Sequence, residues 1–388
     1  MLKLTNSAAW TYETCPKRYE FRYLRRLASH LSAPALSFGS LFHALQEAYW
    51  RAIQARQKTG AQLVPLVEVM PLVLADAGRK WAAERRAEFR AHIEAHGVDE
   101  AAEQALGDGP GSVQGMLTLA TGMMQRHAEK YAAADEARWQ VLGVELHLAA
   151  PLTSSAVQVT TMYEGKIDLI LRDKSTGAVY IVDHKTTAET RPDRYNATLD
   201  LSPQMMGYAW LVGRCVPELP AAPSGAIFNV ARKKLPAEPK PLAKRTKGRG
   251  LSIASTDTTA EMFRAAVAEH DPGNEAAYEE ILRKLDARGD TFLWRHEYVF
   301  PDGALEHWHE GRKALARQMK ACARKGAEFP RSMSACTPFV GAPCPYRHLC
   351  LVPGAEHDPW ALAAFRVDAG TQPVELPQDT KDEEPMPF

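Results

Sequence analysis

The residues best placed to do chemistry lie in two short runs, Gly165-Lys-Ile-Asp168 and Asp183-His184-Lys185. Side chains alternate between the two faces of a β-strand, so Asp183 and Lys185 share one face while His184 points away. A metal-binding carboxylate and an ammonium group would then lie side by side over one reacting phosphate. This spacing is common by chance. Here it directly follows an apolar run, and burying unpaired charge is costly.

A hairpin would bring the two runs together. Lys174–Gly177 is predicted to be a four-residue loop closed by Gly177 in the left-handed conformation. This loop sets a register in which Asp168 lies opposite Asp183, with Cβ atoms about 5 Å apart. One metal ion would then bridge the two carboxylates, whereas a slip of one residue would separate them. A pair of solvated acids is the alternative, and Glu164 is a reserve candidate on the same face.

The elements around this hairpin indicate a mixed fold. A helix is expected after the capping residues Thr5–Ser7, a second from near Ser37, and more over 65–138, where Gly107–Gly111 interrupts them. The order of helix, strands, helix, strand and helix favours an α/β or α+β class. The predicted strands are 139–149, 157–171, 178–184, 226–230 and 292–300, and further helices cover 202–212 and 305–326.

Composition excludes few classes of protein. The 388 residues contain 47 Lys plus Arg and 47 Asp plus Glu, so any basic surface must be local. Residues 1–10 do not resemble a signal peptide, and no run approaches the roughly 18 apolar residues of a membrane span. We therefore expect a cytoplasmic protein with no membrane partner. There is no Gly-rich phosphate loop of a helicase.

Two segments are predicted to lack regular structure. Residues 232–250 form a basic, proline-containing loop, which is either a solvated flexible loop or a loop that meets a phosphate backbone. Residues 366–388 form an acidic, proline-rich tail.

Five motifs between Leu4 and Leu351 resemble, in order, those of the RecB-like branch of the PD-(D/E)XK nuclease superfamily. This module occurs in helicase–nuclease recombination enzymes, CRISPR-associated adaptation nucleases and phage exonucleases. The motifs are Cys15-Pro-Lys-Arg-Tyr19, Phe38-Gly-Ser-Leu-Phe-His43, Gly165-Lys-Ile-Asp168, Asp183-His-Lys-Thr186 and Gln204-Met-Met-Gly-Tyr208. The resemblance implies a restriction-endonuclease-like mixed sheet flanked by helices over residues 1–365, with a helical insertion at about 50–138.

The resemblance also implies the roles of the site residues. His43, Asp168, Asp183 and the backbone carbonyl of His184 would bind Mg²⁺ or Mn²⁺, which suit oxygen and imidazole ligands. Lys185 would orient the attacking water and stabilise charge on phosphorus. Gln204 and Tyr208, four residues apart on one helix face, would brace Lys185 or the phosphate.

The cysteines add a second implied cofactor. In one branch of the family, an N-terminal cysteine and three C-terminal ones hold a 4Fe–4S cluster, which here implies Cys15, Cys336, Cys344 and Cys350. The five-residue gap before Cys350 matches, but seven residues separate Cys336 from Cys344, where two is commoner. Structural zinc and free thiols are the alternatives. Cys215 and Cys322 are expected to be packing residues.

The function implied is metal-dependent hydrolysis of DNA by an exonuclease that acts on ends or single strands in recombination, repair or phage DNA processing. A helicase or recombinase partner would supply any unwinding. The tail Asp382–Phe388 is similar to the tip of single-stranded-DNA-binding proteins, which suggests shared partners. The alternatives are a non-catalytic DNA-end-binding or scaffold protein and a CRISPR-adaptation-type nuclease.

Overall fold

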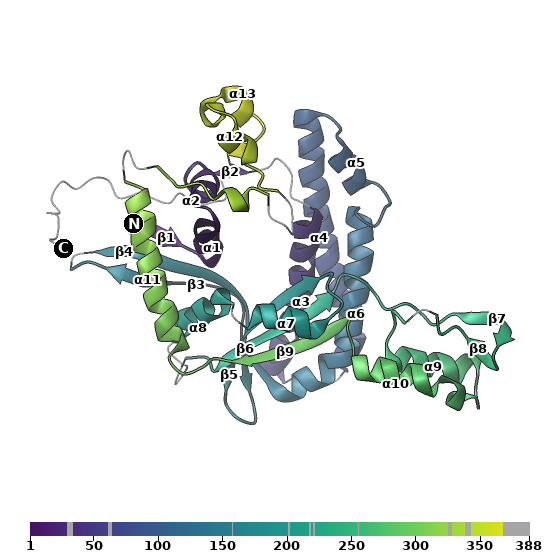
Figure 1. Cartoon of the computed structure of the whole chain (residues 1–388). Coiled ribbons are helices and arrows are strands. Elements are labelled where there is room, and N and C mark those ends of the chain that lie inside the picture. The colour runs from purple at the N-terminus through teal and green to yellow at the C-terminus, as the bar shows by residue number, and fades with distance from the viewer. Residues whose placement is uncertain are drawn as a thin grey trace.

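The computed structural model describes residues 1–28, 34–60, 64–156, 158–200, 202–216, 219, 222–254, 256–324, 328–337 and 343–367. Its centre is a mixed sheet (Figure 1). The strands run in the order β1 (Leu2–Leu4), β4 (Val159–Asp173), β5 (Val179–Thr187), β6 (Gly225–Arg232) and β9 (Leu293–Val299), with β3 (Trp139–Ser154) also paired to β4. The pair β5–β6 is parallel, and β4–β5 and β6–β9 are antiparallel. The predicted mixed α/β class is confirmed.

Strand β4 organises the sheet around the predicted hairpin. One of its edges pairs with β3 along nearly its whole length. The other edge pairs with β1 at residues 161–163 and with β5 at residues 169–172. Asp168 is therefore the first residue of β4 beyond the pairing with β5.

Alternate strand residues pack into two cores on opposite faces of the sheet. Leu169 and Val182 belong to one core, and Ile170 and Ile181 belong to the other. Successive residues of these strands therefore point to opposite faces of the sheet, as expected, and both faces are covered by apolar cores. The first core is covered by α3 (Pro34–Thr59), α4 (Leu66–His96), α5 (Glu100–Leu106) and α6 (Val113–Arg138), and the second by α1 (Asn6–Thr14), α8 (Pro203–Cys215) and α11 (Ala304–Cys322).

Capping residues and glycines mark the ends of several helices, as the sequence predicted. Thr5 caps α1, because its hydroxyl oxygen accepts a hydrogen bond of 3.1 Å from the backbone N–H of Ala8. The break predicted at Gly107–Gly111 separates α5 from α6. Ser112 then caps α6 by accepting from the N–H of Gly115 at 2.9 Å.

The predicted flexible loop at 232–250 has regular structure instead. It contains β7 (Pro241–Thr246) and β8 (Arg249–Leu251), which pair as an antiparallel hairpin. Lys247 and Gly248 at its turn have φ of 51° and 79°. Two left-handed residues give a turn whose twist matches a hairpin. The basic, proline-containing composition gave no sign of this pairing.

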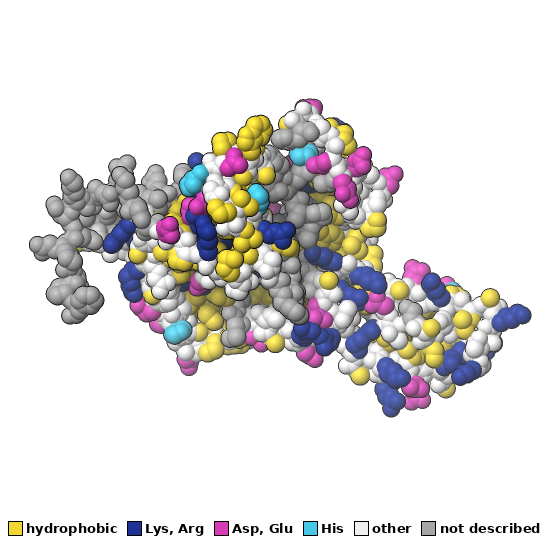
Figure 2. All heavy atoms as spheres, turned by 45° about the horizontal axis from the view of Figure 1, so that its top comes forward, with side chains coloured by type: hydrophobic (Ala, Val, Ile, Leu, Met, Phe, Trp, Pro, Cys, Tyr) yellow, Lys and Arg dark blue, Asp and Glu magenta, His cyan; other side chains and the backbone are white. Residues whose placement is uncertain are grey.

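The hairpin belongs to a small lobe inserted between β6 and β9. Leu251 packs with α9 (Ala260–His270) and α10 (Glu279–Arg288) in a core separate from the other two. The buried carboxylate of Asp271 ties the lobe together, since it accepts hydrogen bonds from the N–H of Gly250 at 2.8 Å and the hydroxyl of Tyr278 at 2.6 Å. The lobe projects from the rest of the molecule in Figure 1, and Figure 2 shows Lys and Arg side chains over it.

The last described residues pair with a segment near the N-terminus. Strand β2 (Leu27–Ala28) pairs with β10 (Arg366–Val367), and the hydroxyl of Tyr346 donates to the carbonyl of Leu27 at 2.6 Å. The start of the segment 366–388 is thus a strand, while Asp382–Phe388 lies outside the described residues. The remaining helices are α2 (Pro16–Tyr19), a π-helical turn (Glu20–Leu24), α7 (Pro192–Leu199), α12 (Arg347–Leu351), α13 (Pro359–Leu362) and short 3₁₀ turns at Glu275–Tyr278, Met333–Ala335 and Ala355–His357.

None of the helices in the described residues combines the length and apolar character needed to span a membrane.

Candidate active site

The hairpin between β4 and β5 has the predicted register. Leu169 pairs with Val182 and Arg172 with Val179, which places Asp168 opposite Asp183 as the next pair. Gly177 closes the turn with φ of 74°. One Asp173 carboxylate oxygen accepts from the backbone N–H groups of residues 175 and 176, which fixes the loop in this conformation.

Asp168 lies where the two strands cease to pair, and its carboxylate is held from two sides. Its Oδ2 atom accepts a hydrogen bond of 3.1 Å from the backbone N–H of His184. The same oxygen lies 3.1 Å from Nδ1 of His43 on α3. The structure therefore brings together two residues that are 125 positions apart in the numbering, as the motif order predicted.

Glu145 joins this group, and the sequence analysis did not identify it. Val144 pairs with Leu169 and Leu146 with Ile167, so Glu145 on β3 lies opposite Asp168 on β4. Ligand atoms of His43, Glu145 and Asp168 all lie within 4.8 Å of one another. Glu145 has φ of 54°, a left-handed conformation that a non-glycine residue rarely adopts, and such strain is often found at functional sites.

The charges at this group favour an ionised Asp168. Burial alone would raise the pKa of Asp168, but the hydrogen bond and charge of His43 and the N–H of His184 outweigh it and lower the pKa to about 2. Burial likewise raises the pKa of Glu145, against the opposing effect of the Lys166 ammonium. A negatively charged carboxylate, a second carboxylate and an imidazole thus face one point.

Asp183 and Lys185 form the second half of the site. Asp183 is buried, and its Oδ2 atom lies 2.7 Å from Nζ of Lys185. Burial raises the pKa of Asp183, an effect that Lys185 opposes. Lys185 Nζ also donates to Oε1 of Gln204 at 3.3 Å, and Nε2 of Gln204 donates to the hydroxyl of Tyr208 at 2.9 Å. The expected bracing of Lys185 by Gln204 and Tyr208 is present in the geometry.

The His184 ring points away from this group, as the strand alternation predicted. It is buried, and its Nδ1 atom lies 3.2 Å from Nδ2 of Asn229 on β6. Oδ1 of Asn229 accepts from Nε of Arg295 at 2.7 Å. Arg295 in turn forms hydrogen bonds of 2.5 and 2.7 Å with Asp135 of α6. This polar network fixes β5 against the helical layer on the face opposite Asp183 and Lys185, where the His184 ring also lies edge-on to the ring of His43 at 5.9 Å.

Two other charged residues near the site, one acidic and one basic, form ion pairs. Glu164, the reserve candidate, lies 4.0 Å from Lys3 of β1. Lys166 forms an ion pair with Glu145. Glu164 remains an untested reserve candidate, and the sequence analysis did not single out Glu145, because Glu145 reaches Asp168 through a strand pairing that no local motif encodes.

A protein-family model described as the PD-(D/E)XK nuclease superfamily matches residues 3–351. The chain belongs to this superfamily. No curated protein matches the sequence significantly. Members of the superfamily are generally nucleases that use divalent ions such as Mg²⁺ or Mn²⁺. The oxygen and imidazole donors of His43, Glu145 and Asp168 fit such an ion, because these hard cations prefer carboxylate ligands and tolerate an imidazole.

The four cysteines of the N- and C-terminal motifs lie together in this nuclease-superfamily chain. Cys15, Cys336, Cys344 and Cys350 all line one small pocket, with Phe21 of the π-helical turn beside them. The backbone N–H of Cys344 donates to the carbonyl of Cys336 at 2.9 Å, so the seven-residue gap closes as a loop. Cys215 and Cys322 are not part of this pocket. The hydroxyl of Tyr12 lies 3.0 Å from Sγ of Cys322.

Proposed function

We propose that this protein is a metal-dependent deoxyribonuclease of the RecB-like branch, and that it acts as an exonuclease in DNA recombination, repair or phage DNA processing. The observation that supports this most is the convergence of His43, Glu145 and Asp168 beside the Asp183–Lys185 pair. A divalent ion held by carboxylates can activate a water molecule and polarise a phosphodiester, and the half-buried ammonium of Lys185 lies beside this group.

Each residue has a distinct role in this proposal. Glu145, Asp168 and His43 hold the divalent ion, with Asp183 and the His184 carbonyl completing its ligands. When bound, the ion supplies Lewis acidity and lowers the pKa of a water molecule. Lys185 donates hydrogen bonds to the attacked phosphate and stabilises the negative charge that grows on it.

Gln204 and Tyr208 are positioning residues in the same proposal. Gln204 accepts a hydrogen bond from the Lys185 ammonium and donates one to the Tyr208 hydroxyl. Tyr208 thus fixes the side chain that orients Lys185. Such support keeps a catalytic group within the small tolerance that reaction geometry allows.

We also propose that Cys15, Cys336, Cys344 and Cys350 hold a 4Fe–4S cluster. The four side chains share one pocket, and four thiolates are the usual ligand set of such a cluster. Zinc would pull its sulfurs to within about 3.8 Å of one another, because Zn–S bonds are about 2.3 Å long and tetrahedral. Metal analysis of the purified protein therefore separates a zinc site from a cluster at these four thiols.

The experiment compares wild type with Lys185→Ala on end-labelled linear DNA and on circular DNA, with Mn²⁺, Mg²⁺ or EDTA. Lys174→Ala is the matched control, because it removes a lysine at the far end of the same hairpin. We expect metal-dependent digestion of linear DNA by wild type and Lys174→Ala, and none by Lys185→Ala. Cleavage of circular DNA would contradict the exonuclease assignment and indicate an endonuclease. Inactivity of the folded wild type with either metal would leave a non-catalytic DNA-end-binding protein.

Iron content and absorbance test the cluster separately. Protein purified without oxygen should be brown and contain about four irons per chain. Cys350→Ala should lose the colour because Cys350 lines the pocket, whereas Cys215→Ala should keep the colour because Cys215 does not line it. Zinc in place of iron, or colour retained in Cys350→Ala, would contradict this assignment.

A further inference from the structure

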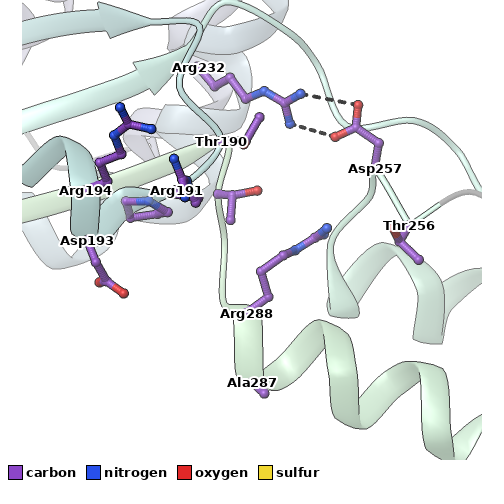
Figure 3. Close-up of a pocket in the computed structure, with 11 residues that line it drawn as sticks. Thr190, Arg191, Asp193, Arg194, Arg232, Thr256, Asp257, Ala287 and Arg288 are labelled. Carbon is purple, nitrogen blue, oxygen red and sulfur yellow. Dashed lines mark hydrogen bonds and ion pairs between the residues drawn. The ribbon is translucent and has the colours of Figure 1, made fainter.

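A second cavity lies where the nuclease core meets the lobe. It encloses about 610 Å³, and its walls come from the start of α7, the end of β6 and α10 (Figure 3). Four arginines and two acidic residues are among its lining side chains: Arg191, Arg194, Arg232, Arg288, Asp193 and Asp257. The lining therefore carries an excess of positive charge although the whole chain is neutral.

Two of the arginines are fixed in place by the lobe. Arg232 Nη1 and Nη2 form hydrogen bonds of 2.6 and 3.5 Å with the carboxylate of Asp257 (Figure 3). Arg288 Nη2 donates to the carbonyl of Thr258 at 2.5 Å. A guanidinium has five N–H donors, so both groups keep donors for a ligand after these contacts. The cavity is preorganised, and this lowers the entropic cost of binding.

Of the other two arginines, Arg194 lies on α7 and Arg191 directly precedes it, and both have only loose acidic contacts. Nε of Arg191 and of Arg194 lie 3.7 and 3.9 Å from the Glu189 carboxylate. These distances are longer than those of a direct hydrogen bond, and both side chains are exposed. Helix α7 is itself anchored, because Nε1 of Trp294 donates to Oδ1 of Asn196 at 2.9 Å.

The cavity lies close to the catalytic candidates along the chain. Lys185 is on β5, and Thr190, five residues later, lines the cavity. Five residues span at most about 18 Å. Tyr195 of α7, next to Arg194, interacts electrostatically with both Lys185 and Asp183. The same short segment thus forms the end of the active site and the wall of the cavity.

We propose that this cavity binds the phosphodiester backbone of one DNA strand, a few nucleotides from the bond that is cut. The inference rests on the function proposed above, and it adds where the substrate strand runs. Planar guanidinium groups match phosphate oxygens in pairs, so arginine is well suited to hold a backbone. The volume lies within the roughly 300–1,000 Å³ range of ligand pockets, which leaves room for a short length of one strand.

The test uses the double variant Arg194→Glu/Arg288→Glu, which reverses charge on both walls. Arg283→Glu is the matched control, because Arg283 lies on the same helix as Arg288 but does not line the cavity. Affinity for a fluorescein-labelled single strand is measured by anisotropy in EDTA over about 50 to 200 mM KCl. Hydrolysis of thymidine 5′-(p-nitrophenyl phosphate) with Mn²⁺ is measured in parallel, since this ester is too short to reach the cavity.

We expect the double variant to bind the strand at least about tenfold more weakly, with a salt slope reduced by about 0.7 for each phosphate that is no longer neutralised. Its hydrolysis of the short ester should match that of wild type and Arg283→Glu, which shows that the double variant keeps a folded active site. Equal affinity and slope in all three proteins would overturn the proposed cavity. Equal weakening by Arg283→Glu would do so too, because it would show a general effect of charge.

The experiment tests the proposed cavity and the proposed nuclease function separately. A wild type that binds through these arginines but cuts no DNA with either metal would disprove the nuclease function and leave the cavity assigned. Normal cleavage together with unchanged binding in the double variant would disprove the cavity alone.

Discussion

Glu145 and Asp168 face each other across the pairing of β3 with β4, and together with His43 they bring three ligand atoms within 4.8 Å. The two carboxylates come from neighbouring strands, so their separation is set by the sheet. His43 reaches them from α3. A strained backbone at Glu145, with φ of 54°, aims its side chain at this point.

The first prediction follows from that geometry. Glu145→Gln should lower metal-dependent cleavage by more than about 100-fold, since even residues that only support a metal ligand cost about 10–100-fold when changed. The activity should be measured against Mn²⁺ concentration to separate weaker ion binding from slower turnover. Glu164→Gln is the control, because Glu164 pairs with Lys3 and is expected to leave activity unchanged. The reverse pattern would restore Glu164 as the functional glutamate.

Glu145→Gly should stabilise the protein while removing its activity. The left-handed conformation costs a non-glycine residue about 1 kcal/mol, and glycine adopts it freely. We expect the free energy of unfolding in urea to rise by about 0.5–1 kcal/mol. Glu145→Gln keeps the Cβ atom and should show no such gain. A loss of stability in the glycine variant would mean that the strain is not present in solution.

The contacts of Gln204 predict a graded series. Gln204→Leu removes the acceptor for Lys185 and should lower the cleavage rate by about 10–100-fold. Tyr208→Phe removes only the acceptor for Gln204 and should have a smaller effect. Both variants should bind DNA as wild type does, because their role is in turnover. A larger reduction in Tyr208→Phe than in Gln204→Leu would contradict the proposed order of support.

The network behind the catalytic strand should be structurally costly to break. Asp135→Ala leaves the buried Arg295 without its carboxylate partner and should destabilise the protein by about 3–5 kcal/mol. The double variant Asp135→Leu/Arg295→Met removes both charges, so its destabilisation in urea unfolding should be smaller than that of Asp135→Ala. Tyr49→Phe removes one hydrogen bond to Asp135 and should cost about 1 kcal/mol. Additive effects in the double variant would show that the ion pair is not coupled.

The hairpin of the lobe predicts a salt-dependent effect on DNA affinity. Lys244→Glu and Arg249→Glu change basic residues of β7 and β8 that the lobe presents around an exposed turn. If they meet a phosphate backbone, affinity falls uniformly across sequences, and each phosphate that is no longer neutralised reduces the salt slope by about one unit. Glu238→Gln in the preceding segment is a charge control of opposite sign. Unchanged affinity would identify the hairpin as a solvated surface only.

The sequence predicted the register of the β4–β5 hairpin correctly, because the loop between the strands specifies it. Gly177 fixes the loop, the loop fixes the register, and the register places Asp168 opposite Asp183. Each of these steps depends on residues close together in the sequence. The alternation of side chains along a strand then determines which residues share a face. The pairing of Gln204 with Lys185 was predicted from motif order alone.

The sequence could not predict what depends on distant pairing. Glu145 is 23 positions from Asp168 in the numbering, and its role follows from the β3–β4 register and an unusual φ. The lobe was missed for a different reason. Its charged, proline-containing start indicated a loop, while Asp271, which orders it, is one ordinary aspartate far along the chain.

The shared pocket of Cys15 and Cys350 has a consequence for biosynthesis. Translation adds about 5–20 residues per second, so the first thiol waits roughly 17 s or longer before the last one is made. During that interval β2 also lacks its partner β10. A polypeptide interrupted before Cys350 would leave β2 unpaired and the cysteine pocket incomplete. Such chains would lack two contacts that hold residues 15–28, and cellular proteolysis would preferentially remove them.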